Sequence, residues 1–327
     1  MLVVIALGGA ALLGRDDHRS TETQSEAVRA AAGAIAQIAR DHQVVVTHGS
    51  APQVGLLSLQ STLFPAVEGY PLDALGAETE GLLGYLVQQE LANQLREQEV
   101  VTLLTQVVVN AADPAFSAPT KRVGPCLAEV DASRLARDHH WVVVPEGRGF
   151  RRVVPSPEPL AIVELKTIRR LVSAGVVVVC AGGGGIPVAL DETAAIHGVE
   201  AVIDKDRSAA LLAALLGADL LVFLTDVPAV VSERGTGFAR PLHYATPAQL
   251  RTLTFPPESM GTKVTAAIRF VEGTGKRAVI GAVSDAGGLL NGQAGTQVTL
   301  EPQVDPWYAA GECGGALLAA WKDGWLP

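Results

Sequence analysis

The stretch 176–206 constrains the fold more than any other part of the chain. It opens with five apolar residues, 176–180, four of them valine. A short β-branched run of this kind, bounded by glycine, predicts a buried parallel strand. Four glycines, 182–185, follow almost directly, and backbone N–H groups in such a run can approach a phosphate with no Cβ in the way. A tight loop without a ligand is the alternative that this pattern leaves open.

The same stretch ends in three consecutive charged residues, Asp204, Lys205 and Asp206. Glycines that approach a phosphate, a lysine, and two carboxylates able to hold a metal ion are groups that phosphoryl transfer needs. A charge triplet is also common on a solvated face, so these residues indicate a function only together with other parts of the chain.

Composition excludes several classes of partner. The chain has 327 residues, 48% hydrophobic and 18% charged, which indicates one large globular α/β domain or two moderate ones. The net charge is -9, the isoelectric point is about 5.3, and no run of lysine or arginine is present. Neither nucleic acid nor an anionic membrane is therefore an expected partner, although local lysines still allow a nucleotide to bind.

Cysteine and histidine positions predict no metal site. Cys126, Cys180 and Cys313 are far apart and the seven histidines are scattered, so the spacing suits neither a disulfide framework nor a metal. The apolar start, 1–7, has no basic lead and is predicted to be a strand rather than a signal peptide. No window approaches the ~20 apolar residues of a membrane helix, and we expect a soluble, cytoplasmic protein.

Apolar periodicity alternates between strand and helix along the chain. Short β-branched runs predict strands, and helical spacing predicts the segments between them. The alternation favours a mostly parallel sheet with helices on both faces. The predicted strands are 2–7, 44–47, 100–109, 176–180, 220–224 and 277–283, and the predicted helices begin near 21 and 246 or span 78–95, 162–171, 208–216 and 264–271.

Glycine-containing turns follow three of these strands, at Gly8-Gly9, at Gly49 and at the glycine run. Ligands of such sheets bind beyond the carboxyl ends of the strands, so we expect the site there. Between 110 and 159 the pattern changes, because prolines cluster, charges increase and short runs are typical of hairpin strands. This region, about 111–159, is predicted to be a small inserted subdomain.

Ten ordered segments resemble the carbamate kinases of the amino-acid-kinase superfamily, collinearly from about 3 to 298. They include VIALGGAALL, HGSAPQVGLL, DPAFSAPTKRVGP, VVVVCAGGGGIPV, GVEAVIDKD and SMGTKVTAA. The resemblance implies a homodimer whose amino-acid-kinase domain, 1–300, is a three-layer α/β/α sandwich. It also implies reversible phosphoryl transfer between carbamoyl phosphate and MgADP, giving ATP and carbamate, with ATP/ADP and Mg²⁺ as cofactors in arginine metabolism. The extension 301–327 lies beyond the family's usual end, and its role stays open.

The resemblance also implies roles for charged residues in separate segments. Lys205 resembles the lysine that neutralises the transferring phosphoryl group, and Lys121 the lysine that moves over the substrate. Lys263 would contact the nucleotide phosphates. Asp204 and Asp206 resemble acids that orient these lysines or Mg²⁺. No Walker A pattern is present, so lysines from separate segments replace the lysine of a P-loop.

Two further groups of residues follow from the same resemblance. The first surrounds the substrate and the transferring phosphoryl group, largely through backbone N–H groups, and the second frames the nucleotide. The substrate group is Gly8, Gly9, Ala10, Gly49, Ser50 and Ala51, and the nucleotide group is Gly182, Gly183, Gly184, Thr225, Asp226, Met260 and Lys263.

Departures from the family pattern fall in both groups. Ala10 stands where the family has asparagine, and Ser50-Ala51 stand where it has Asn-Gly. Ser50 restores one hydrogen bond and Ala10 none, and loss of one transition-state donor typically costs about 10²–10³ in rate. A Cβ at Ala51 is strained if that position needs φ > 0. In the nucleotide half, Pro228, Glu258 and Thr262 replace an acid, a glycine and a proline.

Three alternatives remain beside a carbamate kinase. The same fold could act on another small acid, with the turn substitutions as a change of specificity. A catalytically weak, nucleotide-binding regulatory protein is a second alternative, which the intact lysines and aspartates disfavour. A dinucleotide-binding dehydrogenase is a third and has little support, because no G-x-G-x-x-G with an acidic residue about 20 positions later is present.

Overall fold

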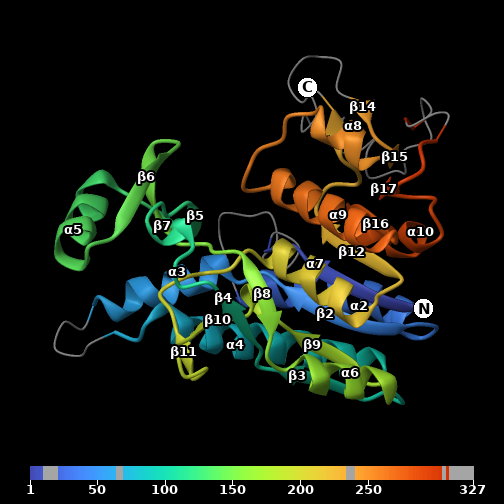
Figure 1. Ribbon diagram of the computed structural model, residues 1–327, viewed down its shortest axis with the longest axis horizontal. Helices are drawn as coiled ribbons and strands as arrows, with labels where there is room; N and C mark the ends of the chain where they lie inside the picture. The colour runs from blue at the N-terminus through green and yellow to red at the C-terminus, as the bar shows by residue number, and fades with distance from the viewer. Residues whose placement is uncertain (10–20, 64–68, 233–239, 304–306, 309–327) are drawn as a thin grey trace.

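The structure is a computed structural model that describes residues 1–9, 21–63, 69–232, 240–303 and 307–308. Its centre is an eight-stranded sheet in the order β15-β17-β16-β12-β1-β2-β9-β3 (Figure 1). Neighbouring strands are parallel, except that β16 and β17 are antiparallel. The strands are β1 (Leu2–Leu7), β2 (Gln43–His48), β3 (Val100–Leu103), β9 (Val177–Cys180), β12 (Leu220–Thr225), β15 (Tyr244–Ala245), β16 (Arg277–Ala282) and β17 (Thr296–Val298).

Helices cover both faces of this sheet, as the alternate residues of β1 show. Val3, Ile5 and Leu7 are fully buried with α2, α4 and α10 on one face, and Val4 and Ala6 are buried with α6, α7, α8 and α9 on the other. Burial on both faces explains the continuous apolar strands, and the predicted three-layer sandwich is confirmed. The helices are α2 (Thr21–Ala39), α4 (Leu72–Gln94), α6 (Leu165–Ser173), α7 (Lys205–Leu216), α8 (Pro247–Arg251), α9 (Met260–Thr274) and α10 (Ala286–Leu290).

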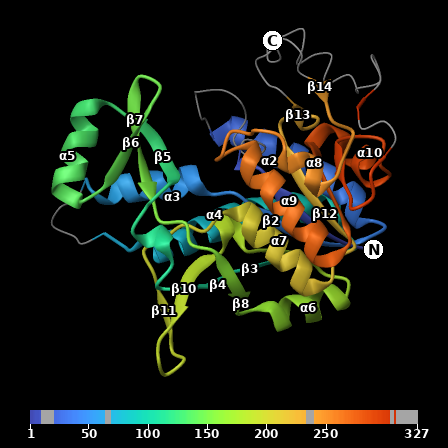
Figure 2. The same ribbon diagram turned by 45° about the horizontal axis from the view of Figure 1, so that its top comes forward.

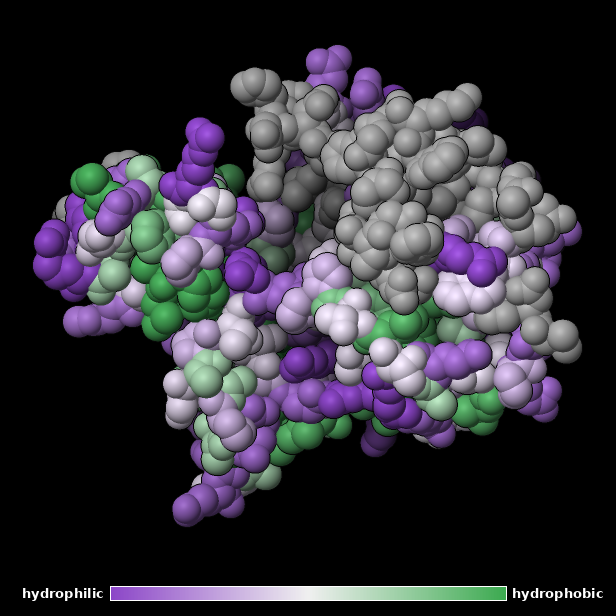
Figure 3. All heavy atoms as spheres, turned by 90° about the horizontal axis from the view of Figure 1, so that it is seen from above, coloured by the Kyte–Doolittle hydropathy of each residue, from purple (hydrophilic) through white to green (hydrophobic). Residues whose placement is uncertain are grey.

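A small unit projects from this body (Figures 1 and 2). It contains the antiparallel strands β5 (Lys121–Leu127), β7 (Gly149–Val154) and β6 (Val142–Glu146), with α5 (Glu129–His139) beside them. We call residues 121–154 the subdomain. Its base is α3 (Ala51–Ser61), which packs along β5. Seen from above, a hollow bordered by hydrophilic residues separates the subdomain from the main body (Figure 3).

A second, four-stranded sheet lies under the subdomain and was not anticipated as a separate sheet. Its order is β11-β10-β4-β8, and only the β10–β4 pair is parallel. A short antiparallel pair, β13 (Val231–Ser232) and β14 (Arg240–Pro241), forms a separate two-stranded sheet. The strands of the second sheet are β4 (Gln106–Val109), β8 (Pro159–Ile162), β10 (Ile186–Leu190) and β11 (Ile196–Gly198).

The prediction of one strand over 100–109 is wrong. The segment forms two strands, because β3 ends at Leu103 in the central sheet and β4 begins at Gln106 in the second sheet. The cause lies at Thr105, whose backbone N–H donates to Glu80 Oε2 (3.2 Å) rather than to a neighbouring strand. The Thr105 hydroxyl accepts from the Ala181 N–H (3.0 Å). A side chain thus replaces a neighbouring strand as the partner of the Thr105 N–H, while the Thr105 carbonyl already accepts from Ile186 N–H of the second sheet (2.8 Å).

Several predicted boundaries also need correction. The predicted helix 162–171 begins only at Leu165, because Ile162 completes β8. The helix predicted from Ser208 begins at Lys205. Strand β16 was expected to close the sheet, but β17 and β15 lie beyond it. Predicted helices at 78–95 and 264–271 are longer, as α4 and α9.

Other expectations concern single residues and spans. Cys180 is fully buried in the core as expected, and Cys126 is exposed. Cys313 and residues 10–20 lie outside the described residues. Within the described part of the chain, no helix is both long and apolar enough to span a membrane.

Candidate active site at the carboxyl ends of the central strands

The turns after β1 and β2 lie directly against each other. The Gly8 N–H donates to Leu224 O of β12 (2.8 Å), and the Gly49 N–H donates to Leu7 O (3.2 Å). A Cβ on Gly49 would lie 3.3 Å from the Gly9 nitrogen, so the two turns approach as closely as backbone permits. The structure thus brings Gly8, Gly9 and Gly49 together as predicted, whereas Ala10 lies outside the described residues.

Lys205 reaches these turns from the start of α7. Asp204 is the N-cap of this helix, and its Oδ1 accepts from the backbone N–H of Asp206 (3.0 Å) and of Arg207 (3.3 Å). A carboxylate at this position satisfies free N–H groups of the first turn and suits the helix dipole. The Lys205 side chain is buried, and a Cβ on Gly49 would lie 3.4 Å from its Cε.

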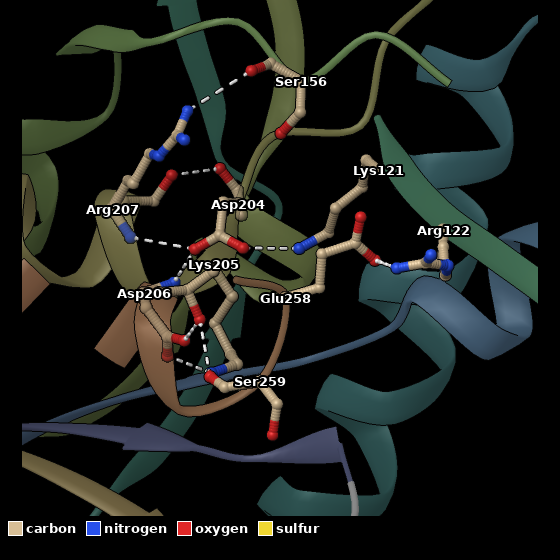
Figure 4. Close-up of polar contacts among 12 residues, drawn as sticks. Lys121, Arg122, Ser156, Asp204, Lys205, Asp206, Arg207, Glu258 and Ser259 are labelled. Atoms are coloured by element: carbon tan, nitrogen blue, oxygen red, sulfur yellow. Dashed lines mark hydrogen bonds and ion pairs between the residues drawn. The ribbon is translucent and has the colours of Figure 1, made fainter. Parts of the chain in front are cut away.

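The three predicted lysines and two predicted aspartates form one network (Figure 4). Lys121 Nζ of the subdomain lies 2.5 Å from Asp204 Oδ2. Lys205 pairs with Asp206 Oδ1, and Lys263 Nζ lies 3.3 Å from Asp206 Oδ2. These residues come from three distant segments, yet they meet beside the two glycine turns. Three lysines against two aspartates leave a formal charge of +1, which suits an anionic ligand.

Burial and pairing shift the pKa values in this network. Burial alone would raise the pKa of Asp206, but Lys205 and Lys263 outweigh it and hold that pKa well below its usual range. The pKa of Asp204 is likewise low despite its burial, because Lys121 lies beside it. Burial lowers the pKa of the Lys205 ammonium, and the Asp206 carboxylate opposes this shift without cancelling it. Both carboxylates are therefore anionic acceptors for lysine at neutral pH.

Thr262 belongs to the same network, although the sequence marked it only as a departure from the family. Its hydroxyl donates to Asp206 Oδ2 at 2.7 Å, the oxygen that also faces Lys263. A hydrogen bond to an ionised carboxylate is among the stronger ones in proteins. Thr262 thus helps to hold the carboxylate that Lys205 and Lys263 share.

The glycine run lies beside the turn after β2 rather than beside the predicted nucleotide residues. A Cβ on Gly183 would lie 2.3 Å from Ser50 Oγ. Two strands, β1 and β2, separate β9 from β12, the strand that ends at Thr225. Gly183 and Gly184 have positive φ (69° and 101°), which glycine adopts without strain.

Most N–H groups of the run serve the fold. The Gly182 N–H donates to Glu80 Oε1 (2.9 Å), and the Gly184 and Gly185 N–H groups donate to Ala181 O (3.1 Å) and Gly182 O (3.0 Å). The Ser208 hydroxyl donates to Gly184 O (2.7 Å), which ties the run to α7. The geometry therefore favours a glycine run that supports the turn after β2 over one that binds a phosphate directly.

Ser50 and Ala51 begin α3. Ser50 is buried and its hydroxyl does not cap the helix. Ala51 is not among the described non-glycine residues with positive φ, so the strain considered for it does not arise. The Ser50 hydroxyl lies beside Gly183, and Ala51 packs against the apolar cluster that contains Val54 and Leu72.

The remaining predicted residues lie on the β12 and α9 side. Thr225 ends β12 and donates its hydroxyl to Asp226 Oδ1 (3.1 Å). A Cβ on Gly8 would lie 3.7 Å from the Thr225 Cα, which places Thr225 beside the first turn. Met260 is the first residue of α9, and Lys263 lies in its first turn. These residues line one side of the network, opposite the glycine run.

Glu80 is a residue of the site region that the sequence did not single out. It is fully buried on α4 and accepts the N–H groups of Thr105 and Gly182. Burial raises its pKa from 4.5 to about 8. One sequence feature could have identified Glu80: it is a glutamate on the apolar face of a predicted helix, at helical spacing from Leu83 and Val87.

His48 lies next to the same glycines. Its ring is fully buried at the end of β2, and a Cβ on Gly182 would lie 2.3 Å from its Cε1. Burial lowers the pKa of His48 to about 4, so the imidazole is neutral at pH 7. A buried, neutral imidazole beside the glycines suits a residue that supports the turn after β2.

These two groups predict how stability depends on pH. The raised pKa of Glu80 removes stability as pH rises from 4.5 to about 8, because the unfolded state then loses a proton that the folded state retains. The lowered pKa of His48 removes stability as pH falls from 6.5 to about 4. Below pH 6.5 the effects of Glu80 and His48 on the free energy of unfolding oppose each other. Between pH 6.5 and 8 the effect of Glu80 remains, so the free energy of unfolding falls as pH rises.

We expect Glu80→Gln to flatten that fall in urea-derived unfolding free energies measured between pH 6.5 and 8. The amide retains an acceptor for one N–H but has no proton to lose. Glu78→Gln, on the same helix, is the matched control and should leave the slope of the wild type. An unchanged slope in Glu80→Gln would show that Glu80 does not titrate in this range.

A sequence model of the amino acid kinase family matches residues 1–282. The carbamate kinase of Haemophilus influenzae is 46% identical over 310 residues, covering 94% of this chain and 100% of the relative. The chain belongs to the carbamate kinase branch of the amino acid kinase family. A second carbamate kinase, from Rhizobium meliloti, is 47% identical over 94% of this chain and 96% of its own length.

Solved carbamate kinase structures agree in fold. The carbamate kinase from Giardia lamblia bound to AMP-PNP superimposes with a TM-score of 0.83 at 38% identity, covering 91% of this chain and 98% of that one. The likeness extends over nearly the whole carbamate kinase fold, including the sequence that contains the five network residues. The family assignment thus agrees with the resemblance first seen in the separate sequence segments.

Proposed function

We propose that this protein transfers a phosphoryl group reversibly between carbamoyl phosphate and MgADP, forming ATP and carbamate. The observation that carries the proposal is the convergence of three lysines and two aspartates on the two glycine turns. Full-length similarity to carbamate kinases supports the choice of substrate. Carbamate then decays to ammonia and CO₂.

The residues present suit this reaction. A terminal oxygen of ADP attacks phosphorus as the P–O bond to carbamate breaks, so no proton must be removed and no base is needed. Phosphoryl transfer depends on position and charge. In our proposal the Lys205 ammonium holds the transferring group in the space that Gly8, Gly9 and Gly49 leave by having no side chains, since the Gly8 and Gly49 N–H groups already donate to Leu224 O and Leu7 O. Lys121 covers the carbamoyl side.

The nucleotide is proposed to bind on the β12 and α9 side. Lys263 would contact its phosphates, and Thr225, Asp226 and Met260 would frame it. The glycine run is proposed to support the turn after β2 rather than to contact the nucleotide, because Gly183 lies against Ser50.

Mg²⁺ fits this site as a companion of the nucleotide. No group of three or more possible metal ligands occurs among the described residues, and Asp204 and Asp206 both face lysines. Mg²⁺ is often bound by substrate phosphates with one or two carboxylates, and these aspartates are the carboxylates at hand. When bound, Mg²⁺ would neutralise phosphate charge.

Organisation and location are further parts of the proposal. We propose one amino-acid-kinase domain over 1–300 with the insert at about 111–159, and an extension over 301–327 whose role stays open. A cytoplasmic homodimer is proposed from the resemblance. The exposed apolar residues Leu82, Tyr85 and Leu104 beside the edge strand β3 are consistent with a covered surface. Light scattering of the purified protein tests the dimer.

A kinase for another small acid is the second candidate, because Ala10, Ser50 and Ala51 replace residues beside the transferring group. The deciding assay couples ATP formation from carbamoyl phosphate and MgADP to a reporter enzyme. We expect activity in the wild type, and an increase of up to about 10² in kcat for Ala10→Asn/Ala51→Gly, which restores one amide donor.

The outcomes separate the candidates. A silent wild type with an active back-substituted protein would mean that the fold and lysines are right but the native acid is different. Silence of both proteins, with MgADP formation from ATP and another small carboxylate, would establish the second candidate. Nucleotide binding by thermal shift without turnover of any acid would indicate the regulatory alternative.

A further inference from the structure

The first two residues of β5 contact two different segments of the main body (Figure 4). Lys121 Nζ lies 2.5 Å from Asp204 Oδ2 at the start of α7. Arg122 Nη1 lies 2.7 Å from Glu258 Oε2, in the segment before α9. Consecutive residues of a strand point to opposite sides, so one side chain is directed to the catalytic network and the next to the nucleotide half.

Glu258 belongs to a compact turn that leads into α9. The Pro256 carbonyl accepts the N–H groups of Ser259 (3.2 Å) and Gly261 (2.9 Å). This turn connects Glu258 rigidly to Met260, the first residue of α9, and hence to Lys263 one turn later. Any displacement of the start of α9 on nucleotide binding therefore displaces the carboxylate that Arg122 contacts.

The environment of Arg122 favours this partner. The other nearby carboxylate, Glu146 of the subdomain, lies 3.7 Å from Arg122 Nε and only 2.5 Å from Arg151 Nε. Glu146 thus pairs most closely with Arg151, and Arg122 pairs most closely with Glu258. The side chains of Arg122 and Glu258 are 39% and 33% exposed, so solvent screens the pair and it contributes little to stability.

Lys121 and Arg122 also pair with Val154 and Val153 of β7, so they move together with the subdomain. Two residues beyond Arg122, β5 packs on α3 through Gly124 and Gly55, where a Cβ on Gly55 would lie 2.0 Å from the Gly124 nitrogen. Gly124 has a φ of 73°, which a larger residue adopts only with strain. The subdomain thus packs on α3 at Gly124, and the two ion pairs connect the first residues of β5 to the segments that begin α7 and α9.

We propose that Arg122 and Glu258 are positioning residues that couple the nucleotide half to the placement of Lys121. This inference rests on the proposed function and deepens it. Nucleotide bound beside Met260 and Lys263 orders the turn that presents Glu258, and Glu258 draws the first residues of β5 over the carbamoyl phosphate. The ion pair thus favours closure of the subdomain when both substrates are present.

The test is a charge-reversal cycle with Arg122→Glu, Glu258→Arg and the double swap. Each reversal is expected to lower kcat/KM for carbamoyl phosphate about five- to tenfold, because a surface pair becomes a like-charge contact. The swap restores the pair and should return within about twofold of wild type. Arg251→Gln, which removes an exposed ion pair to Glu272 in the nucleotide half, is the control and should have no effect.

Hydrogen exchange provides a readout that does not need turnover. AMP-PNP is expected to slow exchange in β5 to β7 of the wild type and the swap, but not of the two reversals. The proposal would be overturned if the double swap lost as much kcat/KM for carbamoyl phosphate as the two single reversals combined. A wild type that forms no ATP would refute the proposed function alone, and the exchange cycle would still decide whether Arg122 and Glu258 couple the two parts.

Discussion

Replacing Lys205 by alanine is expected to lower kcat for ATP formation by about 10³, a loss typical of removing one group that stabilises a transition state. The Lys205 stem lies under Gly49, and its ammonium pairs with Asp206 inside the site. The two other described lysines of the network, Lys121 and Lys263, face other carboxylate oxygens and do not replace it. The KM for MgADP should change far less than kcat, since Lys263 remains.

The control for this prediction is Lys276→Ala. Lys276 is a half-exposed lysine that pairs with Asp219 (3.4 Å), away from the site, and we expect wild-type kinetics. In Lys205→Ala, Asp206 keeps Thr262 and Lys263 as partners, so the fold is expected to survive. Melting temperatures measure this directly. A kcat within tenfold of wild type would show that Lys205 does not face the transferring group.

Much of the fold could be predicted because the information is local. The strand at 176–180 is a valine run, and the central strands β1, β2 and β12 have the same apolar character, so a buried parallel sheet follows from pattern alone. The break at Thr105 could not be predicted in this way. It depends on Glu80 and Ala181, which lie 25 and 76 residues away along the chain, and nothing local distinguishes 100–109 from one long strand.

The site shows the same division between local and distant information. Family resemblance selected the lysines and aspartates, and the structure brings them together. The glycine run shows the limit of local information, because a run of glycines has the same appearance whether its N–H groups meet a phosphate or a carboxylate of the protein. Glu80 is that carboxylate, and its helix is 102 residues away from Gly182 along the chain.

Asp206→Asn is expected to lower kcat by about 10², the size of effect that misplacing catalytic groups produces. Asp206 is the acceptor that Lys205, Thr262 and Lys263 share. Its carboxylate also opposes the lowering of the Lys205 pKa by burial. Asparagine removes that opposition, so the Lys205 pKa falls further and its ammonium loses a proton at lower pH. The decline of kcat on the alkaline side should therefore begin at a lower pH than in wild type.

The measurement is kcat between pH 6 and 9.5 for wild type and Asp206→Asn, with Thr262→Val as a graded comparison. Valine keeps the shape of threonine but removes the hydrogen bond to Asp206 Oδ2, so a smaller change in the same direction is expected, and Thr262→Ser should reverse it. A purely structural role for Asp206 would lower kcat equally at every pH. If kcat of Asp206→Asn instead declines at the same alkaline pH as kcat of the wild type, Lys205 does not depend on this carboxylate for its charge. The group whose deprotonation causes the decline would then be another residue of the network.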